Sequence, residues 1–104
     1  MVKVSILYPA RPGTHFDVEY YLNVHMPMAA RLLGPAIQAI TVEIGVPGPG
    51  PGDTAPFAAI CGFTCARLED FVEAFTPVAD QLRGDIPKYT DIEPVVQVSE
   101  IRIG

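Results

Sequence analysis

The stretch "FDVEYYLNVHMPMAARLLGP", residues 16–35, has the pattern of an amphipathic helix with a histidine and a proline near its middle. Asp17 is a good N-cap, and Phe16 stands where the hydrophobic residue before a cap packs onto the first turn. The Gly-Pro pair at the end of the stretch is a common stop signal. We therefore expect a helix that starts at Asp17, runs to about His25, bends or restarts at Pro27, and stops at that pair.

Strand patterns stand on both sides of this helix. Residues 2–8, "VKVSILY", alternate as a strand does, and "PARPG" then ends the pattern. Residues 36–46 are rich in β-branched types and predict a second strand. The Pro/Gly-rich residues 47–56 predict a loop, because they lack the donors and side chains that regular structure needs. Residues 57–66, "FAAICGFTCA", predict the third strand.

The rest of the chain predicts one more helix and one more strand. Hydrophobic residues recur at helical spacing, at Leu68, Phe71, Val72, Phe75, Val78, Ala79 and Leu82. We expect a kink at Pro77, an end at Gly84, and Asp85 in the turn that follows. Residues 92–103 predict the fourth strand. The order β-α-β-β-α-β is the ferredoxin-like α+β pattern, with a four-stranded antiparallel sheet and both helices on one face.

Hydrophobic residues occur on both faces of the predicted strands. Val4 and Ile6 alternate with Leu7 in the first strand, and Ile40 alternates with Ala39 in the second. Two helices cover only one face of a sheet, so the other face would expose an apolar patch of the kind that marks an interface. We therefore expect a homodimer with facing sheets, and we place Ile40 in its interface.

Composition excludes several classes of protein. At 104 residues we expect a single domain, residues 1–104, and no run reaches the roughly 20 apolar residues that a membrane span needs. The first strand pattern is too short for a secretory signal, so we expect a cytoplasmic protein. The net charge of −5 leaves no basic patch for nucleic acid. Cys61 and Cys65, about 13 Å apart on a strand, are too distant to bridge and are predicted to be small buried residues.

The chain resembles the EthD family, named for ethyl tert-butyl ether degradation, of the dimeric α+β barrel superfamily. The resemblance rests on "VKVSILYP", "FDVEYY", "HMPM", "LLGPA" and "FTPVADQLRGDIPKYTDIEPVVQVSEI", which together cover almost the whole chain. It implies two ferredoxin-like subunits with their sheets face to face, and the family motif singles out His25. The Pro/Gly-rich loop and His15 fall outside the motif. Family members resemble companions of monooxygenase-based ether breakdown, and some relatives resemble lyases or decarboxylating enzymes of polyketide pathways.

His25 and Tyr21 are the candidate catalytic residues. Asp17, Tyr21 and His25 are spaced by four and share one face of the first helix. A histidine next to a phenol suits general acid/base chemistry near neutral pH. The structural alternative is that Asp17 caps the helix, Tyr21 packs in the core, and His25 bonds a backbone carbonyl that Pro27 leaves free.

Tyr8, Tyr20 and Asp85 are the candidate substrate-binding residues. Tyr8 ends the first strand and Tyr20 lies one step round the helix, so both are placed to line a pocket between helix and sheet. The alternative is that both are core aromatics. Asp85 follows a glycine near a strand end, where binding groups are common, but where an ordinary turn aspartate is also common.

The sequence predicts no metal site, since no His or Cys residues stand at ligand spacing. One histidine suffices as an axial haem ligand, so a haem-binding barrel with His25 as the ligand remains an alternative. Our leading hypothesis is a cofactor-free protein that acts on an apolar small molecule by acid/base chemistry, in an ether, aromatic or polyketide pathway. The rival hypothesis is a non-catalytic binding or accessory protein of a monooxygenase system.

Overall fold

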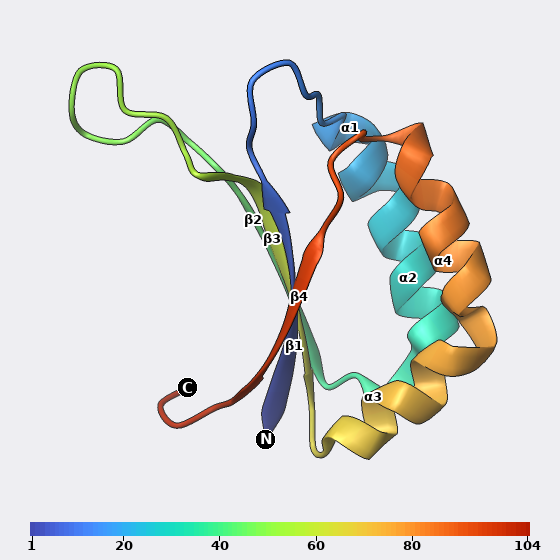
Figure 1. Ribbon diagram of the computed structural model, residues 1–104. Coiled ribbons are helices and arrows are strands. Elements are labelled where there is room, and N and C mark those ends of the chain that lie inside the picture. The colour runs from blue at the N-terminus through green and yellow to red at the C-terminus, as the bar shows by residue number, and fades with distance from the viewer.

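Four antiparallel strands form one sheet in the computed structural model, which describes residues 1–104. Their order across the sheet is β2 (Ala39–Ile44), β3 (Phe57–Cys65), β1 (Val2–Pro9) and β4 (Val95–Glu100). Every strand pairing is antiparallel. Both helical segments lie on the same side of the sheet (Figure 1). The ferredoxin-like α+β architecture predicted from the sequence is therefore confirmed.

The first helical segment changes type along its length. It consists of α1 (Val18–Tyr20), the π-helical turn η1 (Tyr21–His25) and α2 (Met26–Leu33). Asp17 caps it as predicted, because its side chain accepts a hydrogen bond from the Tyr20 amide at 3.1 Å. The π turn ends at His25, two residues before Pro27, whose missing N–H cannot donate to a carbonyl one turn back. The segment stops at Gly34, whose φ of 72° favours glycine.

The second helical segment passes beyond its predicted end. It consists of α3 (Leu68–Phe75), the 3₁₀ turn η3 (Thr76–Val78), which holds Pro77, and α4 (Ala79–Asp85), followed by the 3₁₀ turn η4 (Ile86–Lys88). The predicted end at Gly84 is wrong, because Gly84 has a negative φ and lies inside α4. Asp85 is consequently a buried helical residue and not a turn residue.

The strand register corrects the predicted interface. Ile40 lies opposite Phe63, and residues directly opposite each other share a face of the sheet. Phe63 belongs to the buried core under the helices, so Ile40 lies on the helix side and not on the open face. The error arose because hydrophobic residues occur on both faces of this strand. Hydrophobicity alone therefore did not show which face the helices bury.

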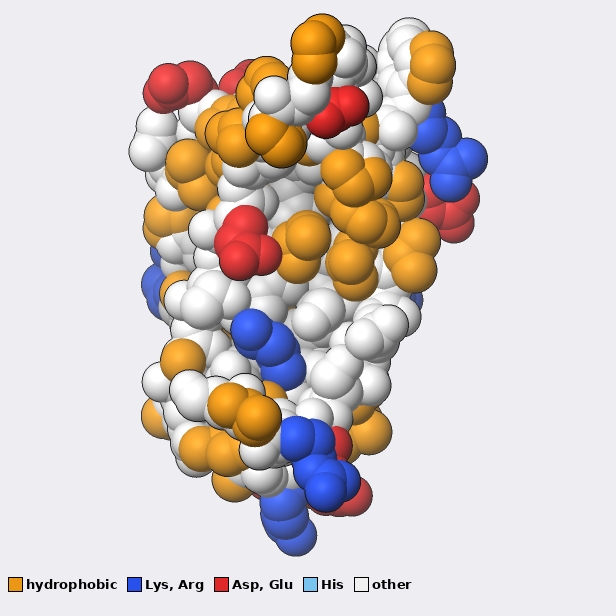
Figure 2. All heavy atoms as spheres, turned by 90° about the vertical axis from the view of Figure 1, so that its left-hand side faces the viewer, with side chains coloured by type: hydrophobic (Ala, Val, Ile, Leu, Met, Phe, Trp, Pro, Cys, Tyr) orange, Lys and Arg blue, Asp and Glu red, His pale blue; other side chains and the backbone are white.

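The open face of the sheet is apolar only in part. Leu7, Ile60 and Val95 lie side by side in one row of this face, and Glu43 stands at the β2 end of that row. Lys3, Ser5 and Gln97 lie on neighbouring rows. Figure 2 shows this face, with hydrophobic side chains gathered mainly over its upper half, beside acidic ones, and with Lys and Arg side chains mainly toward its lower half. The prediction of strands that are apolar on both faces is therefore only partly correct.

The core lies between the sheet and the helices. Both cysteines are buried there as free thiols, as predicted. Residues 47–56 form the predicted loop, which projects from the β2–β3 hairpin away from the helical layer (Figure 1). No helix combines the length and the apolar character that crossing a membrane requires.

Candidate active site

A cavity of about 200 Å³ lies between the sheet and the helices. Most of its lining residues are hydrophobic, and its inner wall includes the buried Val4, Tyr8, Ala29, Leu33 and Phe63. Its rim is formed by less buried residues, Phe75, Arg83, Ile86, Pro94 and Val96. The cavity therefore opens between the second helical segment and the edge strand β4, and it ends at the first helical segment.

His25 lines the cavity from the last position of the π turn. Its Nδ1 atom lies 2.9 Å from Oδ2 of Asp85, at the end of α4, 60 residues further along the chain. No hydrogen bond joins Nε2 to the protein, yet every fully buried side-chain polar atom has a partner. Nε2 is therefore reached by solvent, and the cavity that His25 lines provides the access.

Asp85 is a buried carboxylate with three polar neighbours. Besides His25, the Tyr20 hydroxyl donates to Oδ1 at 2.8 Å, and Nζ of Lys88 lies 3.7 Å from the same oxygen. Burial by itself would raise the pKa of Asp85, but the hydrogen bonds from His25 and Tyr20 and the charge of Lys88 hold that pKa below its usual range. Asp85 is therefore ionised at neutral pH.

The ionised carboxylate determines the tautomer of neutral His25. A carboxylate can only accept hydrogen bonds, so Nδ1 carries the proton and donates it to Asp85. The lone pair of the imidazole then resides on Nε2, the nitrogen with access to the cavity. This arrangement is that of an oriented general base, with the carboxylate also stabilising the imidazolium that forms when the base takes a proton.

Two tyrosine rings hold the imidazole in place. Tyr21 stacks on His25 with ring centroids 5.7 Å apart and planes inclined by 13°, and Tyr89 packs against the same ring at 4.7 Å. Burial, together with the nearby Cys61 thiol, raises the pKa of Tyr21. Its hydroxyl makes no hydrogen bond with His25, and Tyr21 does not line the cavity. The geometry thus gives Tyr21 a contact with the imidazole ring and none with the cavity.

Tyr8 reaches the cavity from β1 and is linked to Tyr89. The two hydroxyl oxygens lie 2.6 Å apart, and burial raises the pKa of Tyr8 to about 12. Tyr8 is therefore protonated at neutral pH, and its one proton is free for a ligand when Tyr89 donates the hydrogen bond between the two hydroxyls.

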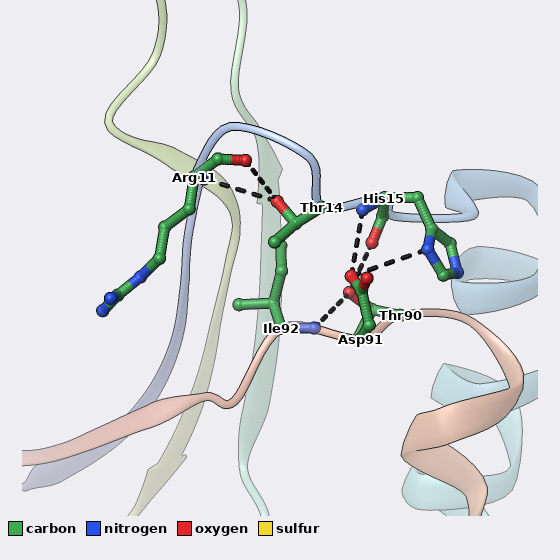
Figure 3. Close-up of polar contacts among 6 residues, drawn as sticks. All are labelled: Arg11, Thr14, His15, Thr90, Asp91 and Ile92. Atoms are coloured by element: carbon green, nitrogen blue, oxygen red, sulfur yellow. Dashed lines mark hydrogen bonds and ion pairs between the residues drawn. The ribbon is translucent and has the colours of Figure 1, made fainter.

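A set of loop contacts secures the segment that carries Tyr89. The His15 amide donates to Oδ1 of Asp91 at 3.0 Å, and the Thr90 hydroxyl donates to the His15 carbonyl at 2.6 Å (Figure 3). The Ile92 amide donates to the same Thr90 hydroxyl at 3.0 Å. We call these four residues the clasp. Because it joins the loop before α1 to the segment after η4, the clasp holds the start of the first helical segment close to the end of the second.

The structure gathers the residues singled out from the sequence at one end of the molecule. His25, Asp85 and Tyr20 form one hydrogen-bonded group, Tyr21 stacks on His25, and Tyr8 lines the cavity. The sequence alternative of a histidine bonded to a backbone carbonyl is wrong, because the Nδ1 partner is a carboxylate.

Arg83 was missed as a site residue, and Tyr89 was not among the predicted site residues. Tyr89 follows Asp85 at a spacing of four, a signal that had no weight while this segment was expected to be a turn.

No group of three or more His, Cys, Asp or Glu side chains is arranged to hold a metal ion.

Fold and site together define a ferredoxin-like α+β protein that encloses a mostly apolar cavity, lined by a histidine that is bonded to a buried carboxylate. The model of the EthD domain matches residues 15–93, and the chain belongs to the EthD family. No curated protein matches the sequence.

Solved structures agree with this assignment. An EthD-like protein from Ralstonia eutropha JMP134 is 41% identical, with 98% of this chain and 92% of that one covered and a TM-score of 0.92. An EthD family protein from Bacillus halodurans C-125 is 19% identical, with coverages of 96% and 97% and a TM-score of 0.66. A protein from Bacteroides fragilis NCTC 9343, described as dimeric, of unknown function and ferredoxin-like, is 20% identical, with coverages of 96% and 95% and a TM-score of 0.58. The last two likenesses concern the fold alone.

Proposed function

We propose that this protein binds an apolar small molecule in the cavity and transfers a proton on it, with His25 as the general base. The observation that carries the proposal is that His25, which lines a cavity of mostly hydrophobic residues, is hydrogen-bonded to ionised Asp85. At about 200 Å³ the cavity is smaller than the roughly 300–1,000 Å³ typical of pockets for drug-sized ligands, which favours a ligand of one or two rings.

The reaction class that fits is removal of a proton from carbon next to a carbonyl group. Nε2 of His25 takes the proton, and the electron pair of the C–H bond moves into the carbonyl group to form an enolate. Tyr8 is the candidate donor of a hydrogen bond to the enolate oxygen. Return of the proton to another atom makes the reaction an isomerisation, attack of the enolate carbon on a second carbonyl makes it a cyclisation, and loss of a leaving group makes it an elimination.

The other residues of the site have supporting roles in this proposal. Asp85 sets the tautomer of His25, and Tyr20 keeps Asp85 oriented. Tyr21 and Tyr89 restrict rotation of the imidazole, which makes Tyr21 a positioning residue and not a proton donor.

We also propose a homodimer formed through the open face of the sheet. The apolar row of Leu7, Ile60 and Val95 supports it, and the relative from Bacteroides fragilis is described as dimeric.

A generic carbon acid tests the base before the natural substrate is known. 5-Nitrobenzisoxazole is small and apolar, and removal of its ring C–H proton breaks the N–O bond to release a coloured phenolate. We expect the protein to accelerate this reaction over buffer, and the rate to fall in acid, where an imidazole is protonated. His25→Gln should lower the rate by roughly 10²-fold or more, because glutamine can still donate to Asp85 but cannot accept the proton near neutral pH.

His15→Gln is the matched control, since it makes the same change at the exposed histidine. It should leave the rate unchanged. Equal rates for His25→Gln and the unmodified protein would refute the proposal. Saturable binding of the probe with no acceleration would favour the non-catalytic binding protein.

A further inference from the structure

Arg83 is the one cationic side chain on the lining of the cavity. It lies in the last turn of α4, on the rim, and its side chain is exposed. Its guanidinium carbon lies 5.3 Å from the centroid of the Phe75 ring, which also lines the cavity. A guanidinium stacked on an aromatic face is held in position while the N–H groups along its edges stay free to donate.

No acidic residue of the chain takes up those N–H groups. Arg83 belongs to none of the ion pairs, although the chain carries 12 acidic residues against seven Lys and Arg. The nearest cation in the sequence, Lys88, is engaged with Asp85. The rim therefore presents a positioned and unneutralised guanidinium beside a cavity whose lining is hydrophobic except for His25 and the Tyr8 hydroxyl.

We propose that the ligand is an apolar carboxylate, whose hydrocarbon body fills the cavity and whose carboxylate binds Arg83 at the rim. This inference rests on the proposed function, because it takes the same cavity as the ligand site and adds the chemical class of the ligand. Arginine suits the task, since its planar fork of donors matches both oxygens of a carboxylate. At the rim the carboxylate keeps contact with water, so its binding avoids the large cost of burying a charge.

Arg83 and His25 lie at different ends of the cavity. Arg83 marks the entrance end, whereas His25 belongs to the first helical segment, at the inner end. A ligand anchored by its carboxylate at the rim directs the opposite part of its body toward Nε2 of His25. Arg83 is then the residue that determines which end of the ligand reaches the base.

Two probes of equal size test the inference. 2-Naphthoate and 2-naphthamide share a ring system and differ in charge, and their dissociation constants can be measured from the amide resonances of cavity residues such as Ala29 and Leu82. We expect naphthoate to bind about 10-fold or more tightly than naphthamide. Arg83→Gln should abolish that preference by weakening naphthoate while leaving naphthamide unchanged, and Arg83→Lys should retain part of it.

Arg31→Gln is the matched control, because Arg31 is exposed on α2, belongs to no ion pair and does not line the cavity. It makes the same change in net charge and should keep the full preference. Equal affinities of the two probes for the unmodified protein would overturn the inference, and so would a preference that survives Arg83→Gln.

The same measurements separate this inference from the proposed function. If naphthamide binds in the cavity without a preference for naphthoate, the carboxylate class is wrong and the ligand site stands. If neither probe binds in the cavity, both the ligand site and its chemical class are wrong. If the unmodified protein prefers naphthoate but does not accelerate the 5-nitrobenzisoxazole reaction, only the role of His25 as a base is contradicted.

Discussion

Asp85 joins the two helical segments by accepting from His25 and Tyr20 while Lys88 lies nearby. Its pKa is lowered in the folded protein, so its contribution to stability is present above the unfolded value of about 3.9 and is lost as the pH falls through the folded value. We predict that Asp85→Asn lowers the free energy of unfolding at pH 7, and that the difference from the unmodified protein shrinks below about pH 4. Urea unfolding between pH 3 and pH 7 measures this.

Asp91→Asn is the control for the Asp85 prediction. The His15 amide also lowers the pKa of Asp91, so the sign is the same, but this side chain is 50% exposed and solvent screens it. Its effect should be the smaller of the two. An Asp85→Asn variant whose deficit grows in acid would contradict the assigned direction of the Asp85 pKa.

The β2–β3 loop and the clasp differ sharply in what holds them. Within the loop, Asp53 accepts from the Gly50 amide at 2.8 Å, and both groups lie near the surface. We predict that deleting residues 48–52, "GPGPG", changes the melting temperature by only a few degrees, since roughly 1 kcal/mol or less is involved. Thermal melts followed by circular dichroism measure this.

Thr90→Val weakens the clasp and is compared with the deletion in the β2–β3 loop. It removes the hydroxyl that bonds both His15 and Ile92 in the clasp, and about 1–3 kcal/mol is at stake because Thr90 is buried. Its melting temperature should fall by roughly 4–8 °C per kcal/mol. A loop deletion more damaging than Thr90→Val would mean that the loop packs against another surface.

The whole molecule exposes an apolar row on the open face of its sheet, where Leu7 lies opposite both Ile60 and Val95. We predict a dimer at micromolar concentration by sedimentation, with an interface above roughly 1,200 Å². Val95→Asp should shift it to monomer, because dimerisation would bury an unpaired charge. Val95 is 53% exposed in the single chain, so the variant should still fold.

Val98→Asp is the matched control for Val95→Asp. Val98 lies on the same strand at 48% exposure, but it is opposite Val4 on the helix side of the sheet. The Val98→Asp variant should remain dimeric. An unmodified protein that sediments as a monomer, or a Val95→Asp variant that stays dimeric, would contradict the open face as the interface.

Local patterns predicted most of the elements because the forces behind them act within a few residues. The Asp17 cap, the stop at Gly34 and the alternation in β1 and β3 depend on neighbours in the chain, and the structure confirms them. The end at Gly84 failed because glycine is tolerated inside a helix whose other residues pack well. That error moved Asp85 into a turn and concealed its spacing with Tyr89.

The sequence by itself determined the order of the elements and the ferredoxin-like fold, and it marked His25 as a candidate catalytic residue. Tertiary structure decided which group bonds His25, since Asp85 is 60 residues away and meets it only when the two helical segments pack side by side. It also decided that Ile40 faces the helices, because strand register is set by burial of one whole face. Periodicity is a local property of the chain, whereas contacts between distant residues depend on packing and register, and only the folded molecule contains those.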